Sequence, residues 1–282
     1  MIGGLLLALQ VFSPTDPAQL RPIYEQAIAQ RKLKFGETSA EFAAAMGDYG
    51  RFLARIADTS GASDWLERAV TVAGRLEDKQ ALALTLERAD QPRAEALHEE
   101  VGRKAKGELA AVSWSRMGAL LQARGGLPQA ATAYRTAIDT STNGEKRAIR
   151  LNELALLYKG QGNLKDAEPL LRQAVTLQQK LLGPTSPELG ATLNNLSGLL
   201  LDARRPAEAE PLARRALDIF DGTLGHTHVR TGIAVSNLAD VLMARGATAQ
   251  AVKFYQRALA IFEKELGPEH PWTRDVRQAI VQ

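Results

Sequence analysis

Few side chains in this sequence have both the residue type and the spacing that metal binding requires. His226 and His228 are separated by a single residue, so in isolation their imidazoles could chelate a metal ion. However, His228 and His270 occupy the same place in two similar segments, which favours a structural role in capping or packing. His98-Glu99-Glu100 begins the H-E-x-x-H zinc motif, but Gly102 occupies the place of the second histidine. Since the chain also has no cysteine, the sequence predicts no metal site.

Motifs for catalysis and cofactor binding are missing as well. The sequence contains neither a phosphate-binding loop of the type Gly-x4-Gly-Lys-Ser/Thr nor the Gly-x-Ser-x-Gly nucleophile motif. Gly160-Gln161-Gly162 lacks the third glycine of a dinucleotide motif and is better explained as a turn between helices. Carboxylates such as those of Glu99, Glu100 and Asp202 have no partner that would enter a dry pocket with them, so a solvated helix face explains them. We therefore expect no enzyme activity and no cofactor.

The composition describes a folded, helical chain. Its 282 residues are 45% apolar, 24% charged and 5% aromatic, with a formal net charge of +3. This apolar content excludes a disordered chain, and the abundance of Ala and Leu favours helices. The basic clusters are short and mixed with acidic residues, and few aromatic side chains are available for base stacking. Nucleic acid is therefore not the expected partner.

Residues 1–13 leave two interpretations open. Residues Ile2 to Phe12 are nearly all apolar, too short a run for a bilayer span of about 20 residues but long enough for the hydrophobic part of a secretory signal. No Lys or Arg precedes the run and no clear small-x-small cleavage site follows it, which favours a buried capping helix. A signal segment predicts a periplasmic or secreted protein, and a capping helix predicts a cytoplasmic one. No other segment is apolar enough to cross a membrane, so we expect no stable membrane span.

Three segments in the second half repeat with a constant period and align without a gap. They begin at Leu151, Leu193 and Val235, which gives a period of about 42 residues. The superposed sets are Leu154, Leu196 and Leu238; Ala167, Ala209 and Ala251; Ala174, Ala216 and Ala258; and Gly183, Gly225 and Gly267. Such a period is typical of stacked helical units that share one continuous core.

An earlier copy of the unit identifies the type of repeat. It carries Trp114, Met117, Gly118, Leu121, Gly125, Ala130, Tyr134 and Ala137 at the spacing W-x2-L-G-x2-Y…G…A-x3-Y-x2-A. This segment resembles the tetratricopeptide repeat (TPR), a helix–turn–helix unit of about 34 residues. The three later copies are longer and end in a linker of the type L-G-P-x-H-P, and in this they are similar to the repeats of the kinesin light chain family and its bacterial relatives. The resemblance implies an all-α fold, a right-handed solenoid of antiparallel helix pairs.

The resemblance covers nearly the whole chain. Residues 111–282 are expected to hold the well-defined units, with a short C-terminal helix after them. These units are 111–144, 148–181, 190–223 and 232–265. Residues 14–110 carry degenerate TPR-like units, including a second helix over 17–34 and a worn unit over about 77–106. Because neighbouring repeats share a core, we expect one elongated domain rather than two globules.

Small residues and turn residues are expected to set the geometry of each unit. Ala155, Ala167 and Ala174 would let two helices cross closely, at about 8–10 Å between their axes. Glycines at the ends of the helices are expected to adopt the left-handed conformation: Gly125, Gly162 and Gly246 after first helices, and Gly183, Gly225 and Gly267 after second helices. Pro22, Pro169 and Pro211 share one register, so their helices either start late or bend slightly.

In the TPR family, the first helices of successive units line a concave groove, and the resemblance implies which residues face it. The predicted groove residues are Asn152, Asn194, Asn195, Asn237, Arg116, Leu156, Leu201, Asp240 and Met243. Asn195 and Asn237 match an asparagine that kinesin light chain-like repeats carry in their peptide groove, whereas Asn152 stands one residue early, beside Glu153. An amide offers a donor and an acceptor, so it can pair with the backbone of an extended peptide. The alternative is that these amides bond to a neighbouring helix or cap a turn.

The remaining groove positions predict the chemistry of the partner. Few Lys or Arg residues face the groove, in contrast to the carboxylate clamp of chaperone-binding relatives. Small residues such as Ala119, Ala191 and Gly198 leave a small apolar floor, and Leu156, Leu201 and Met243 are expected to anchor apolar side chains.

The sequence therefore predicts a non-catalytic module that binds a peptide or protein segment in the concave groove. Two alternatives stay open, because one fold serves many functions. The first is self-association through the terminal residues Trp272–Gln282 to build a structural scaffold. The second is an enzyme with a site that no motif reveals.

Overall fold

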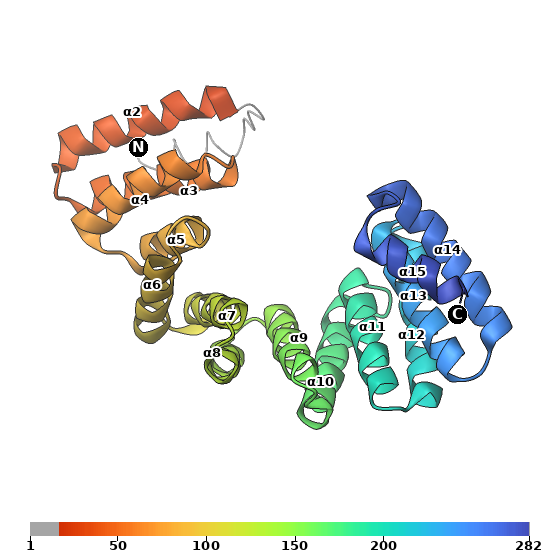
Figure 1. The fold of residues 1–282 in the computed structure, drawn as a ribbon. Helices are drawn as coiled ribbons and strands as arrows, with labels where there is room; N and C mark the ends of the chain where they lie inside the picture. Colours follow the sequence, from red (N-terminus) through yellow and green to blue (C-terminus); the bar gives the residue numbers. More distant parts are fainter. Residues whose placement is uncertain (1–16, 282) are drawn as a thin grey trace. The chain divides into compact units, whose positions relative to one another are not determined.

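The computed structural model describes residues 17–281, and every regular element in this range is an α-helix (Figure 1). The two interpretations of residues 1–13 concern residues outside this range. The chain divides into two compact units, one ending at Arg124 and the other beginning at Gly125, whereas the sequence predicts one elongated domain. None of the helices within 17–281 is both long enough and apolar enough to span a bilayer.

The first unit contains the less regular part of the sequence. Its helices are α2 (Pro17–Phe35), α3 (Ala40–Arg55), α4 (Thr59–Ala73), α5 (Leu76–Leu86), α6 (Gln91–Lys104) and α7 (Gly107–Ala123). Each helix packs on the next one along the chain, and the closest pair is α3 with α4. The residues that mark this pair in the sequence are buried at the contact, among them Tyr49, Leu53, Ala62 and Leu66.

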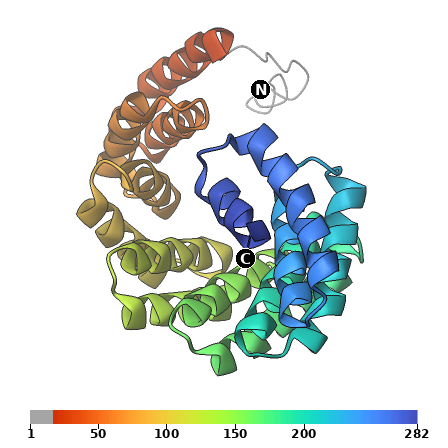
Figure 2. The same cartoon turned by 45° about the vertical axis from the view of Figure 1, so that its right-hand side comes forward.

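The second unit holds the segments that repeat with a constant period. Its helices are α8 (Leu127–Thr140), α9 (Gly144–Gly160), α10 (Leu164–Leu182), α11 (Pro187–Asp202), α12 (Pro206–Thr223), α13 (Val229–Ala244), α14 (Thr248–Leu266) and α15 (Pro271–Val281). The tightest pairs are α9 with α10, α11 with α12 and α13 with α14, and the first helices α9, α11 and α13 also contact one another in turn. Both views show these pairs stacked side by side (Figure 1 and Figure 2).

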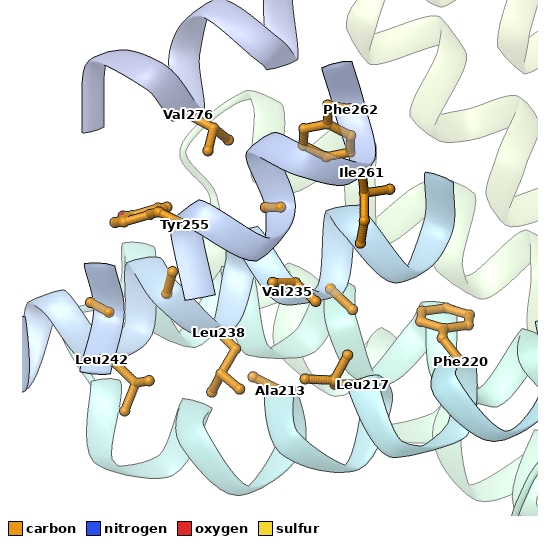
Figure 3. Packing of buried hydrophobic residues seen from close by; sticks show 14 residues of the cluster. Ala213, Leu217, Phe220, Val235, Leu238, Leu242, Tyr255, Ile261, Phe262 and Val276 are labelled. Atoms are coloured by element: carbon orange, nitrogen blue, oxygen red, sulfur yellow. The ribbon is translucent and has the colours of Figure 1, made fainter. Parts of the chain in front are cut away.

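Alanine at the helix crossings makes this stacking tight, as the sequence predicts. Ala155, Ala167 and Ala174 are fully buried, and so are Ala209 and Ala216 one repeat later. One core of the second unit fills the space between α12, α13, α14 and α15 with side chains such as Phe220, Leu238, Tyr255, Phe262 and Val276 (Figure 3). The prolines in the shared register lie inside α2, α10 and α12, so these helices do not start late.

The glycines that follow the second helices have a special backbone conformation. Gly183 has φ 88° and ψ 173°, and Gly267 has φ 90° and ψ 164°. The positive φ is confirmed, but the left-handed helical conformation expected for these residues is wrong. Their ψ values lie in the mirror image of the extended region, which essentially only glycine adopts. These glycines therefore turn the chain sharply into the linker instead of closing the last helical turn.

The linker that follows is built twice in the same way. In the second copy, His270 Nδ1 accepts a hydrogen bond from the backbone N–H of Trp272 at 3.3 Å, and the Thr273 hydroxyl donates to the Gly267 carbonyl at 2.8 Å. In the first copy, His228 Nδ1 accepts from the backbone N–H of Arg230 at 3.0 Å. The structural role predicted for these histidines is confirmed, because both cap the start of a helix.

One turn inside the repeats is built without glycine. The turns after α9 and α13 place Gly162 and Gly246 at φ 74° and 78°, and the corresponding residue between them is Arg204, with φ 60°. A residue with a Cβ is strained at positive φ, whereas glycine is not. Arg204 is exposed and forms no ion pair with any residue of the described range.

We expect the substitution Arg204→Gly to raise the free energy of unfolding by about 1 kcal/mol, because it removes the strain of the left-handed conformation. The measurement is urea unfolding followed by far-UV circular dichroism. Arg204→Ala is the control: it removes the same charge but keeps a Cβ, so it is expected to leave the midpoint nearly unchanged. An equal gain from both substitutions would assign the effect to the charge instead.

Candidate functional site

The predicted groove asparagines form hydrogen bonds from one repeat to the next. Asn195 on α11 donates from Nδ2 to Asn152 Oδ1 on α9 at 3.0 Å. One repeat later, Asn237 on α13 donates from Nδ2 to Asn194 Oδ1 at 3.0 Å and to the Asn194 carbonyl at 3.2 Å. In both cases the donor is one residue further along its repeat than the acceptor. This arrangement, the asparagine ladder, holds the first helices in register, and it corresponds to the alternative in which the amides bond to a neighbouring helix.

The ladder lies along a cavity of about 370 Å³ in the second unit. The predicted residues Asn194, Asn195, Asn237 and Asp240 all line this cavity, as does Gly198. The remaining lining residues are Lys159, Ile233, Ser236, Tyr255, Phe262, Trp272, Asp275, Val276 and Ala279. Its size lies within the range of about 300–1,000 Å³ that is common for ligand pockets. We call it the groove cavity.

The floor of the groove cavity is open at one helical glycine. A Cβ built on Gly198 would meet only Lys159 Nζ at 3.3 Å and Asn237 Oδ1 at 3.6 Å. The Lys159 ammonium lies 3.2 Å from Asp202 Oδ2, so its charge is already paired. Gly198 therefore leaves this part of the floor without a side chain, but the groups next to it are polar, whereas the sequence predicts an apolar floor.

Asp240 and Tyr255 form the most polar point of the cavity. The Tyr255 hydroxyl donates a hydrogen bond to Asp240 Oδ1. Asp240 is open to solvent, yet the walls of the cavity surround its carboxylate, and this burial raises the pKa of Asp240 above its ordinary value. Burial and the bond to Asp240 also raise the pKa of Tyr255. The carboxylate is thus poorly compensated, since a neutral hydroxyl is its only hydrogen-bond partner in the described part of the chain.

The predicted apolar anchors do not line the groove cavity. Leu156 is exposed, Leu201 is half-buried, and Met243 packs partly buried against the core of the second unit. The structure instead brings in residues that the sequence analysis did not select, chiefly Tyr255 from α14 and Trp272 and Asp275 from α15. The sequence could have shown that α15 contributes to the cavity. Its start lies one full period after the start of α13, so α15 has the register of a first helix.

Arg116, the remaining predicted groove residue, lies in the first unit. Its guanidinium makes two hydrogen bonds to the carboxylate of Glu87, one of them from Nε to Oε1 at 2.7 Å. The same carboxylate lies 3.1 Å from Nε2 of the buried His98. Burial alone would raise the pKa of Glu87, but the hydrogen bonds from His98 and Arg116 outweigh it and lower the pKa to about 2.

This cluster borders a second cavity, of about 960 Å³, within the first unit. Its arginines are Arg51, Arg55, Arg88 and Arg116. Arg51 and Arg116 are paired with carboxylates, whereas Arg55 and Arg88 form no ion pair within residues 17–281. The sequence analysis did not predict this group of arginines in the first unit.

The histidine pair that could have chelated a metal is used otherwise. His226 Nδ1 lies 2.9 Å from Asp221 Oδ1, and His228 Nδ1 caps α13. Across residues 17–281, no three His, Asp or Glu side chains gather in a way that could hold a metal ion.

The sequence also matches a known family of repeats. The family described as "Tetratricopeptide repeat" matches residues 109–180, 146–222 and 230–281, which is more than half of the chain. The chain therefore belongs to the tetratricopeptide repeat family. The comparison with curated proteins gives no match.

Solved structures show the same fold. BtubC (BKLC) from P. vanneervenii is similar with a TM-score of 0.64 at 24% identity, over 77% of this chain and 92% of that one. Kinesin light chain-type TPR-like repeats from Podospora anserina give 0.56 at 24% identity, over 68% and 97%. PilF from Pseudomonas aeruginosa gives 0.60 at 16% identity, over 86% and 99%. The predicted resemblance to kinesin light chain-like repeats and the all-α TPR solenoid are thus confirmed at the level of fold.

We expect the asparagine ladder to stabilise the second unit measurably. In a double-mutant cycle of Asn152→Ala and Asn195→Ala, the coupling energy should be about 1 kcal/mol, the usual net value of one hydrogen bond. The measurement is urea unfolding of the four proteins. The pair Asn152→Ala and Asn237→Ala, which share no hydrogen bond, is the control and should be additive. A coupling near zero for the first pair would show that the ladder bond contributes nothing.

We expect the Glu87 cluster to make the stability of the first unit depend on pH. Because the pKa of Glu87 is lowered from 4.5 to about 2, its contribution is complete above about pH 4.5 and is lost as the pH falls toward 2. Glu87→Gln should therefore lower the free energy of unfolding by about 2–3 kcal/mol at pH 7 and by much less near pH 2. In a Trp272→Phe background, fluorescence of Trp65 and Trp114 during urea unfolding reports on this unit. The same loss at both pH values would contradict a role for the ionised carboxylate.

Proposed function

We propose that this protein is a non-catalytic interaction module that binds a protein or peptide segment in the groove cavity. TPR proteins are typically non-catalytic scaffolds for protein interaction, and the chain belongs to that family. The single observation that carries the proposal is the convergence of Asn194, Asn195, Asn237 and Asp240 on one open cavity. These residues belong to two different repeats, so their convergence depends on the stacking of the first helices.

The ladder also indicates which backbone group of the partner would be bound. Asn237 uses its amide nitrogen on Asn194, while its Oδ1 lies toward Gly198 and makes no hydrogen bond to another described residue. An amide oxygen is an acceptor, so it suits a backbone N–H of an extended segment. Shape and backbone pairing of this kind hold a segment without selecting its sequence, and selection would then fall to the side chains at the cavity wall.

Self-association is the second function that the sequence leaves open, and one observation favours it. Trp272 is 45% exposed and Val281 is 84% exposed, so α15 presents apolar surface. A mass of several chains by light scattering would support this function, and a single-chain mass would leave the groove cavity as the proposed site.

Gly198 offers the sharpest test of the groove cavity. Replacing Asn195 or Asn237 would disturb binding and the ladder together, whereas a side chain at Gly198 fills the cavity without removing a hydrogen bond. We expect peptides selected from a random-peptide display library on the wild-type protein to lose binding to Gly198→Trp, as measured by fluorescence polarisation.

Gly198→Ala is the matched control. A methyl group would lie 3.3 Å from Lys159 Nζ, a close contact that a small shift of this flexible side chain relieves. Alanine in a helix interior is more stable than glycine by about 0.5–1 kcal/mol, so this variant should be slightly more stable and still bind. Selected peptides that bind Gly198→Trp as tightly as the wild type would place binding elsewhere on the protein.

A further inference from the structure

Two carboxylates of the groove cavity have no cationic partner. Asp240 and Asp275 both line the cavity, and neither has a Lys, Arg or His within ion-pair distance anywhere in residues 17–281. The one lysine of the cavity, Lys159, is paired with Asp202. The cavity therefore carries negative charge that this part of the chain does not neutralise.

This situation differs from the outer helices of the same unit. There several acidic residues are paired with arginine: Glu168 with Arg172 and Arg205, Glu210 with Arg214 and Arg245, and Asp221 with Arg257. Other acidic residues of this unit, such as Asp218 and Glu269, also lack an ion pair in the described range, but Asp240 and Asp275 are the two acidic residues that line the cavity.

The repeat itself does not require these carboxylates. The residues that correspond to Asp240 in the two preceding repeats are Gly198 and Leu156, and those that correspond to Asp275 are Ile233 and Ala191. Tyr255, which holds Asp240, differs in this respect: Ala213 and Leu171 stand at its position in the two preceding repeats, but Tyr134 stands there in the unit 111–144. Residues that build the stack recur from repeat to repeat, so the stack does not explain why carboxylates stand at positions 240 and 275.

An exposed aromatic ring completes the same cavity. Trp272 begins α15 at a place where the preceding repeat has Arg230. Its ring lies 5.9 Å from the ring of Phe262 and 5.2 Å from that of His270, and 45% of the residue stays exposed. Contact with Phe262 and the capped linker therefore orients the indole, and its exposed surface lies at the cavity.

We propose that the groove cavity takes a lysine or arginine side chain of the bound segment, an inference that rests on the proposed function. The methylene groups of such a side chain pack along Trp272, and its cationic group reaches the carboxylates of Asp240 and Asp275. Aromatic rings attract cations, and carboxylates form strong charge-assisted hydrogen bonds with ammonium and guanidinium groups. An acidic side chain would meet uncompensated like charge in the same place.

The test uses the display-selected peptides whose binding depends on Gly198. In each peptide, every lysine or arginine is replaced in turn by norleucine, and binding is measured to the wild type and to Asp240→Asn/Asp275→Asn. Asparagine keeps an oxygen that can accept the Tyr255 hydroxyl, so this variant removes charge with little change in shape. Asp218→Asn, which changes an exposed acid on α12 outside the cavity, is the matched control for net charge.

The expected result is that one basic residue recurs among the peptides and that its replacement weakens binding to the wild type by about tenfold or more. This loss should largely disappear in Asp240→Asn/Asp275→Asn and remain in Asp218→Asn. Gly198-dependent peptides that need no lysine or arginine, or a loss that is the same in all proteins, would overturn the inference and leave the proposed function standing. If no selected peptide depends on Gly198, both are overturned.

Discussion

Close crossing of helices at alanine is the constraint on which the rest of the second unit depends. Where Ala167, Ala174 and their counterparts meet a facing helix, no side chain keeps the backbones apart, so each helix pair has one close-packed arrangement. Because the same contact returns in every repeat, the first helices lie at a constant offset. Only at that offset does the amide of Asn195 reach Asn152, and that of Asn237 reach Asn194. The arrangement of residues along the cavity thus depends on the alanine contacts at the helix crossings, which lie outside the cavity.

In a regular repeat, residues needed for packing recur in each unit, so they can be distinguished from residues that occur in one unit. Stability in such a protein comes from each unit and its neighbours, so a residue needed for packing must recur. Ala279 illustrates the opposite case, because it stands where Asn195 and Asn237 stand in earlier repeats and ends the ladder at α15. The ladder ends where Trp272 and Asp275 enter the cavity wall, so α15 keeps the register of a first helix but changes its chemistry.

The sequence predicts the repeated features well because they depend on local packing. Periodicity places the buried alanines and the capping histidines, and the family resemblance pointed to Asn194, Asn195, Asn237 and Asp240, which all line the cavity. The sequence analysis fails for residues whose role is confined to one place in the chain. Tyr255 and Trp272 look like ordinary core residues in the sequence, and the free arginines Arg55 and Arg88 lie in worn repeats whose groove register is hard to assign. The φ of Gly183 was predictable, but its ψ depends on the linker that follows.

Asp240 and Glu87 are both carboxylates, but the protein stabilises their charges to different degrees. Glu87 is mostly covered and Asp240 is open to solvent, but protein atoms around both carboxylates desolvate them in part, and this acts to raise the pKa of each. Glu87 receives hydrogen bonds from a guanidinium and an imidazole, which more than offset burial, so its charge is stabilised within the fold. Asp240 receives one from a neutral phenol, which offsets burial only in part. A carboxylate whose charge the fold leaves uncompensated gains the most from a cation supplied by a partner, because the cost of placing it in the cavity has already been met during folding.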